Sequence, residues 1–177
     1  MSSNSDSGAF VIRKGQVLLQ NVDFITPLVN DPFTFGAIAA ANALSDVFTM
    51  GGRVLTALNI LSYPNGQIDT VTINNILKGG LSKIQEAGGI LLGGHTTDNS
   101  ELVYGLAVTG IVSQSKIVTN STARVGDDLI LTKPLGNTLV AMAYSRDSGK
   151  LPLEMANTAI ESMTLLNKYG SQTMKKV

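Results

Sequence analysis

The chain contains no cysteine and no tryptophan, and only one of its 177 residues is a histidine. Without cysteine, a protein forms no disulfide, no zinc–thiolate cluster and no thiol nucleophile. A single histidine excludes a metal site built from several histidines. Any metal bound here must therefore be a hard cation such as magnesium, held by carboxylates, amides and water.

Charge is also scarce, because only 15% of the residues are charged and the 13 basic side chains balance the 13 acidic ones. An average soluble domain has about 25% charged residues. No basic run is present, so we expect no direct binding of nucleic acid. No apolar run approaches the roughly 20 residues that span a membrane, and the start, MSSNSDSGAF, lacks the regions of a signal peptide. We therefore expect a cytoplasmic protein without membrane contact.

Several familiar catalytic motifs are missing from the sequence. It has no GxxxxGK[ST] loop, no GxGxxG after a strand, no GxSxG and no HExxH. Carboxylates, amides and glycine-rich turns remain as the groups that could carry chemistry.

Hydrophobic residues make up 44% of the chain, enough for one or two compact domains. The pattern predicts strands over 16–24, 53–63, 90–92 and 102–112. It predicts helices over 34–50, ended by Gly51 and Gly52, and over 69–87, ended by Gly88 and Gly89. This alternation indicates an α/β or α+β fold.

The composition turns polar around residues 121–128, where we place a domain boundary. We expect an N-terminal domain over 1–122. The pattern over residues 123–177 predicts one strand (129–135) and helices over 136–147 and 152–170. That is too little for a sheet-based domain, so we interpret this part as the beginning of an incomplete C-terminal α/β domain.

Polar residues in apolar surroundings are the first candidate site residues. Asn42 and Asp46 lie four apart in an apolar helix and so share one face. A buried carboxylate is costly unless it is paired or bound to a cation. The alternative is that both belong to the solvated stripe of the helix. Asp23 ends a buried strand, either as a ligand or as a cap of the next turn, and Asp6 lies in a polar run typical of a flexible tail.

The stretch Gly93-Gly94-His95-Thr96 follows a short predicted strand. Consecutive glycines allow a backbone to approach a phosphate closely, and free amides with a threonine hydroxyl can hold it. The same pair of glycines also suits any tight turn, and His95 alone is more often a hydrogen-bonded structural residue.

Three stretches of the sequence resemble the selenophosphate synthetase family: VDFITPLVNDPFTFGAIAAANALSDVFTMGG, GGILLGGHTTDNSELVYGLAVTGIV and STARVGDDLILTKPLG. The resemblance runs from about residue 3 to residue 177. The family belongs to the aminoimidazole ribonucleotide synthetase-like ATP-binding enzymes, which include thiamine-monophosphate kinase.

The resemblance implies a magnesium-dependent reaction in which ATP, selenide and water give selenophosphate, AMP and orthophosphate. It also implies a homodimer in which the mixed sheets of two N-terminal domains form a shared barrel-like sheet. Matched to the family motifs, the nucleotide-binding residues are Ser3, Asn4, Ser5, Asp23, Asn42, Asp46, Gly94, His95 and Thr96, of which the last three reach the nucleotide across the dimer. The implied magnesium ligands are Asp6 and Asp46.

Two family features are missing from the sequence. The family carries a glycine-rich segment with a reactive cysteine or selenocysteine and a nearby lysine before the first matched motif, and a further magnesium ligand after the last. We therefore assign no catalytic residue and expect a chain truncated at both ends that is inactive alone. The alternatives are a non-catalytic dimerisation and nucleotide-binding module, or another synthetase or kinase of the superfamily.

Overall fold

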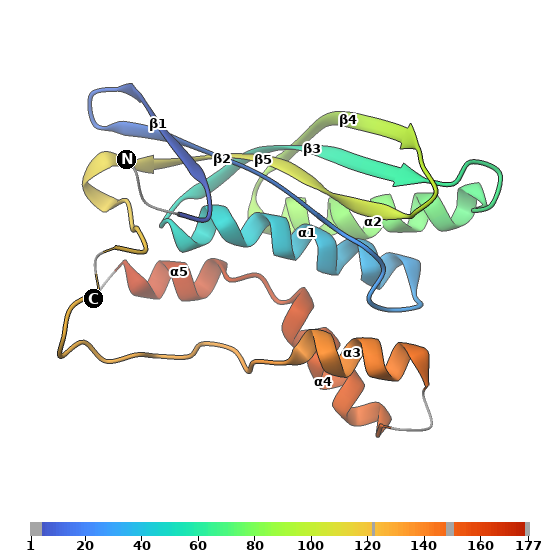
Figure 1. Cartoon of the computed structure of the whole chain (residues 1–177). Coiled ribbons are helices and arrows are strands. Elements are labelled where there is room, and N and C mark those ends of the chain that lie inside the picture. The colour runs from blue at the N-terminus through green and yellow to red at the C-terminus, as the bar shows by residue number, and fades with distance from the viewer. Residues whose placement is uncertain (1–4, 122, 148–150, 176–177) are drawn as a thin grey trace.

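The computed structural model describes residues 5–121, 123–147 and 151–175. Figure 1 shows a layer of strands with helices beneath it. The first part of the chain forms β1 (Gly8–Arg13), β2 (Gln16–Ile25), α1 (Pro32–Thr49), β3 (Arg53–Tyr63), α2 (Thr70–Ala87), β4 (Ile90–Asp98) and β5 (Val103–Ser113). The second part forms a short 3-10 helix (Gln114–Lys116), α3 (Asn137–Arg146), α4 (Leu153–Thr164) and α5 (Lys168–Met174). The predicted α+β class is confirmed.

The five strands form one mixed sheet in the order β1-β2-β5-β3-β4. Only β3 and β4 run parallel, and every other neighbouring pair is antiparallel. Helices α1 and α2 cover one face of this sheet, and among the described residues no helix covers the other face (Figure 1). The sheet therefore has one buried face and one open face.

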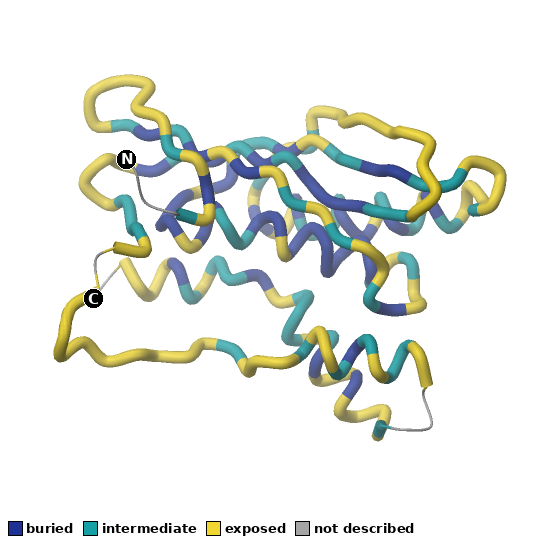
Figure 2. The backbone as a smooth tube through the Cα atoms, in the orientation of Figure 1, coloured by how far each residue is buried: buried dark blue, intermediate teal, exposed yellow. Residues whose placement is uncertain are grey.

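The core lies between the sheet and the two helices, as the buried backbone in Figure 2 shows. Alternate side chains of a strand point to opposite faces, and Val17 and Leu19 of β2 and Leu106 of β5 point toward the helices, where they are fully buried. They meet apolar residues of α1 such as Phe35 and Leu44, which are also buried. This burial of apolar area is the main source of stability.

Short-range chemistry fixes the ends of both core helices. The Asp31 carboxylate accepts a hydrogen bond from the backbone N–H of Thr34 (2.8 Å) at the start of α1. The Asp69 carboxylate does the same for Thr72 (2.8 Å) at the start of α2. Gly88 ends α2 with a φ of 83°, a left-handed conformation that favours glycine.

Glycines also allow the two core helices to approach closely. A Cβ atom on Gly36 of α1 would lie 2.0 Å from the backbone oxygen of Ile76 on α2. A Cβ atom on Gly79 of α2 would likewise lie 2.0 Å from the backbone oxygen of Phe33 on α1. Any larger residue at either position must push the helices apart, which would move α1 relative to the sheet.

The structure adds one strand that was not predicted and corrects three predicted elements. Strand β1 was not predicted, because the polar run around Asp6 was interpreted as a tail. Strand β4 continues to Asp98, so the stretch expected as a loop after residue 92 is strand. The predicted strand over 129–135 is wrong: this segment is neither helix nor strand, and Leu129 and Ile130 are 93% and 82% exposed because no described strand pairs with them. The helix predicted over 152–170 is interrupted, because Leu165 adopts an extended backbone between α4 and α5.

The C-terminal helices lie on the side of α1 and α2 that faces away from the sheet (Figure 1). Side-chain hydrogen bonds help to attach them: Asn167 Nδ2 donates to Ser45 Oγ (2.9 Å), and Lys168 Nζ donates to the backbone oxygen of Glu86 (3.1 Å). Within the part of the chain that the structure describes, no helix is both long enough and apolar enough to cross a membrane.

Candidate functional site

Strand β2 changes from apolar to polar along the face that it turns toward α1. Val17 and Leu19 are fully buried, Asn21 is 9% exposed and Asp23 is half-buried. Helix α1 lies over this end of β2 and presents Asn42 and Asp46, which are one helical turn apart. The alternation of the strand and the period of the helix thus bring four polar side chains to one place.

Hydrogen bonds between these side chains join the strand to the helix. Asn42 Nδ2 donates to Asp23 Oδ2 over 2.5 Å. Asn21 Nδ2 donates to Asp46 Oδ2 over 3.1 Å and to the backbone oxygen of Ala43 over 2.9 Å. Each carboxylate is therefore held by one amide from the opposite element. Asn42 is exposed, as a solvated stripe would require, but Asp46 is half-buried and bonded to β2.

The electrostatics of this carboxylate cluster, Asp6, Asp23 and Asp46, are unfavourable for a protein alone. Burial, followed by repulsion from Asp23 and Asp6, raises the pKa of Asp46 from 3.8 to about 6, although the hydrogen bond from Asn21 acts in the opposite direction. Among the described residues, Lys83 forms an ion pair with Glu86, and no basic side chain forms an ion pair with Asp6, Asp23 or Asp46. A cation would relieve this repulsion.

These carboxylate and amide groups suit a partly hydrated magnesium ion better than a metal ion whose ligands all come from the protein. Carboxylate and amide oxygens are the ligands that Mg²⁺ prefers, and Mg²⁺ usually keeps several waters and substrate phosphates. In the described residues, no group of three or more carboxylate or histidine side chains is already arranged around one metal position. The cluster is consistent with a site that carries one or two protein ligands and is completed by a nucleotide.

The other sequence-predicted site residues lie elsewhere or outside the described part. Ser3 and Asn4 are outside the described residues, and Ser5 is half-buried beside Asp6. Gly94, His95 and Thr96 are exposed on β4, at the opposite edge of the sheet from β1.

The sheet register shows how far this second group lies from the cluster. Asp23 pairs with Leu106, Leu106 with Asn59 and Asn59 with Gly94. Three strand spacings separate Asp23 from Gly94, which is about 14 Å. One copy of the chain therefore does not bring the two groups together.

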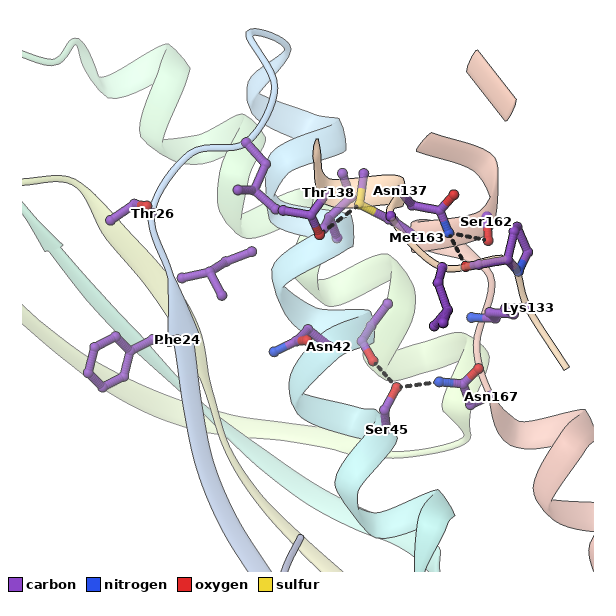
Figure 3. Close-up of a pocket in the computed structure, with 17 residues that line it drawn as sticks. Phe24, Thr26, Asn42, Ser45, Lys133, Asn137, Thr138, Ser162, Met163 and Asn167 are labelled. Atoms are coloured by element: carbon purple, nitrogen blue, oxygen red, sulfur yellow. Dashed lines mark hydrogen bonds between the residues drawn. The ribbon is translucent and has the colours of Figure 1, made fainter. Parts of the chain in front are cut away.

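A cavity of about 720 Å³ opens beside the carboxylate cluster, between the end of β2, helix α1 and the segment 133–138 (Figure 3). Asn42 borders both the cavity and Asp23. Figure 3 shows that the polar lining comes from both parts of the chain, with Asn42, Ser45, Lys133, Asn137, Ser162 and Asn167. A cavity of this size suits a small-molecule ligand.

Lys133 supplies the charge in the lining of this cavity. Its ammonium group donates a hydrogen bond to the backbone oxygen of Leu165. Burial and repulsion from Lys83 lower the pKa of Lys133. The cavity thus holds one basic side chain, which faces a lining without carboxylates.

Sequence reasoning missed Asn21 and the cavity residues other than Asn42. A signal for Asn21 was present, because an asparagine follows Val17 and Leu19 in the inward-facing row of an alternating strand. No such signal exists for Lys133 or Asn167, since their neighbours are set by how the C-terminal helices dock on α1.

The chain matches the family model described as AIR synthase related protein, N-terminal domain, over residues 4–112. The selenide, water dikinase of Geobacter metallireducens is 51% identical over 169 residues, which are 96% of this chain and 49% of that protein. The selenide, water dikinase of Caldanaerobacter subterraneus is 44% identical over 177 residues, which are 100% of this chain and 50% of that protein.

A solved structure, AaThiL complexed with AMPPCP and TMP, shares the fold with a TM-score of 0.83 at 17% identity, over 97% of this chain and 57% of that one. The chain spans about half the length of the curated relatives it matches. These relatives confirm the resemblance to selenophosphate synthetases that the motifs indicated. From its family match over residues 4–112, the chain belongs to the AIR synthase related proteins.

Proposed function

We propose that this chain is the magnesium- and ATP-binding part of a selenophosphate synthetase. The enzyme would convert ATP, selenide and water into selenophosphate, AMP and orthophosphate. The observation that carries the proposal is the convergence of Asp6, Asp23 and Asp46 without a basic partner among the described residues. The likeness to two selenide, water dikinases supports the choice of reaction.

The chain's own residues would contribute binding and positioning. Asp6 and Asp46 would hold the magnesium ion, with Asp23 and Asn42 beside the nucleotide. When bound, the ion would neutralise charge on the phosphates, and phosphoryl transfer depends mainly on such neutralisation and on positioning. The AaThiL structure, which holds AMPPCP and TMP, supports nucleotide binding by this fold. In this account residues 1–122 form the nucleotide-binding domain, and residues 123–177 begin the second domain.

The open face of the sheet favours a homodimer. Val22 and Leu92 on this face are 63% and 65% exposed, and Phe24 and Leu58 are also exposed. A shallow groove of about 420 Å³ runs between Val22, Leu58 and Leu92. Exposed apolar residues grouped in this way are typical of protein interfaces. The family resemblance implies that Gly94, His95 and Thr96 reach a nucleotide bound across the dimer, and their distance from Asp23 within one chain is compatible with that role.

A non-catalytic dimerisation and nucleotide-binding module is the second candidate. It is favoured by the exposed apolar side chains on the open face of the sheet, which suit an interface between two copies. Sedimentation combined with ATP titration separates the enzyme from the non-catalytic module. A module of this kind would form a stable dimer that binds ATP and never hydrolyses it, even when extended to full length.

The proposed reaction is tested by following AMP and selenophosphate formation from ATP, selenide and Mg²⁺. The assay compares this chain with a version extended to the full length of its relatives. We expect the extended version to form both products and the chain alone to form neither. Turnover of the extended version only with another acceptor, such as thiamine monophosphate, would contradict the proposal and favour a different enzyme of the superfamily.

A further inference from the structure

Asn21 occupies an inward-facing position of β2, where the preceding inward-facing residues are apolar. It follows Val17 and Leu19 in the inward-facing row of β2 and is 9% exposed. Its neighbours in this row complete the core against α1. A leucine or valine at position 21 would continue the row without introducing any polar atom into the interior.

The amide of Asn21 is committed to helix α1. Both hydrogens of its Nδ2 atom have acceptors, the Asp46 carboxylate at 3.1 Å and the backbone oxygen of Ala43 at 2.9 Å. Turning the amide over would place Oδ1 against these two oxygens, so the orientation of the side chain is fixed.

The other end of the same amide has no partner. Asn21 Oδ1 is buried and accepts no hydrogen bond from any residue that the structure describes. An unpaired buried oxygen makes the folded state less stable. The position thus retains a polar residue at a cost to the fold, and the benefit it brings is the contact with Asp46.

That contact restrains a carboxylate that two like-charged side chains repel. Asp23 and Asp6 repel Asp46, and free rotation of its side chain would carry its charge away from theirs. The Asn21 hydrogen bond holds Oδ2 toward β2, on the side where Asp23 lies. The orientation of the Asp46 carboxylate is therefore fixed before any cation arrives.

We infer that Asn21 is a positioning residue that holds the Asp46 carboxylate in the orientation in which it meets a divalent cation. The inference rests on the proposed function, because it assigns a role toward the cation of that site. Residues that orient metal ligands through hydrogen bonds typically change metal affinity by 10- to 100-fold when they are replaced.

The test replaces Asn21 by leucine in the whole chain and titrates Mg²⁺ by calorimetry in the presence of AMPPCP. We expect a dissociation constant for Mg²⁺ that is at least about tenfold higher than that of the wild type. The melting temperature is measured alongside, because the variant loses both the unpaired Oδ1 atom and the two hydrogen bonds of Nδ2. A purely structural role would lower the melting temperature and leave the affinity unchanged.

Ser171→Ala is the matched control, because Ser171 on α5 also carries a buried unpaired oxygen and lies outside the carboxylate cluster. It should leave Mg²⁺ affinity unchanged. Asn21→Val repeats the test with a smaller side chain of the type found at Val17, in case leucine at this position does not fold.

Wild-type Mg²⁺ affinity in the folded Asn21→Leu and Asn21→Val variants would overturn the inference while leaving the proposed function intact. If the wild-type chain itself binds no Mg²⁺ with AMPPCP, the proposed function fails, and the inference fails with it.

Discussion

Asn42 on α1 donates a hydrogen bond to Asp23 on β2, 19 residues earlier in the chain, and also borders the cavity formed with the C-terminal segment. This contact links the carboxylate cluster to the cavity. A nucleotide whose phosphates reach the cluster would therefore have the cavity immediately beside it. The arrangement places the acidic site at the junction of the two parts of the chain.

Replacement of Asp46 by asparagine should abolish magnesium-dependent nucleotide binding without unfolding the protein. The change keeps the size of the side chain but removes a charge that Asp23 and Asp6 repel. Calorimetric titration of AMPPCP with Mg²⁺ should show at least about a tenfold loss of affinity. Asp128→Asn, an exposed carboxylate in the segment after β5, is the control and should bind as the wild type does. Unchanged binding in Asp46→Asn would remove Asp46 from the site.

The stability of the chain should carry a pH signature of Asp46. Its pKa is about 6 in the folded state, compared with 3.8 for an unperturbed aspartate. Between these values the folded chain binds more protons than the unfolded chain, so stability from this group falls as pH rises from about 4 to about 6 and then stays constant. The melting temperature of Asp46→Asn minus that of the wild type should therefore increase as the pH rises across this window. A constant difference would contradict the repulsion that we describe.

Magnesium binding should weaken as the solution becomes more acidic than this pKa. Protons and the cation compete for the same carboxylate. The Mg²⁺ affinity of the wild type should thus decline below about pH 6. Calorimetric titrations from neutral pH downward measure this directly, and an affinity independent of pH would show that Asp46 is not a ligand.

Gly36 should be intolerant of substitution because of the close approach of α1 and α2. The Cβ atom of Gly36→Ala would lie 2.0 Å from a backbone oxygen of Ile76, which cannot rotate away. We expect a loss of about 1–3 kcal/mol in the free energy of unfolding, measured by denaturant titration. Gly170→Ala in α5 is the control, since its Cβ atom has no neighbour closer than 4.0 Å. It should be neutral or stabilise the chain by up to about 1 kcal/mol.

The open face of the sheet should govern self-association. Val22→Asp and Leu92→Asp each place a charge on this face, and we expect each to weaken the homodimer by at least about tenfold in sedimentation analysis. Val71 on α2 is 70% exposed on the helical side, so Val71→Asp is the matched control and should sediment as the wild type does. A wild-type chain that remains monomeric at high concentration would contradict the homodimer.

The sequence allowed the prediction of those elements whose signals are local. The apolar spacing and the terminating glycines at 51, 52, 88 and 89 located both core helices closely. The extent of β4 was missed because two glycines and two threonines look like a turn, and only pairing with β3 makes them a strand. Residues 129–135 have strand composition but no described partner strand, so composition alone misled.

Prediction of the site followed the same division. Spacing placed Asn42 and Asp46 on one helical face, and family motifs added Asp6 and Asp23. Neither could show that Asn21 bridges Asp46 and Ala43, because that contact joins residues far apart in the sequence. Nor could they show that Gly94 lies across the sheet from Asp23, which follows from the order of the strands.

The most direct measurement of the central claim is the location of the bound cation. Mn²⁺ added with AMPPCP broadens the NMR signals of nearby nuclei, so backbone resonances report where it binds. We expect selective broadening of the signals of residues 21–24 of β2 and 42–46 of α1. Broadening that spares these residues and appears elsewhere, such as along the cavity segment 133–138 alone, would contradict it.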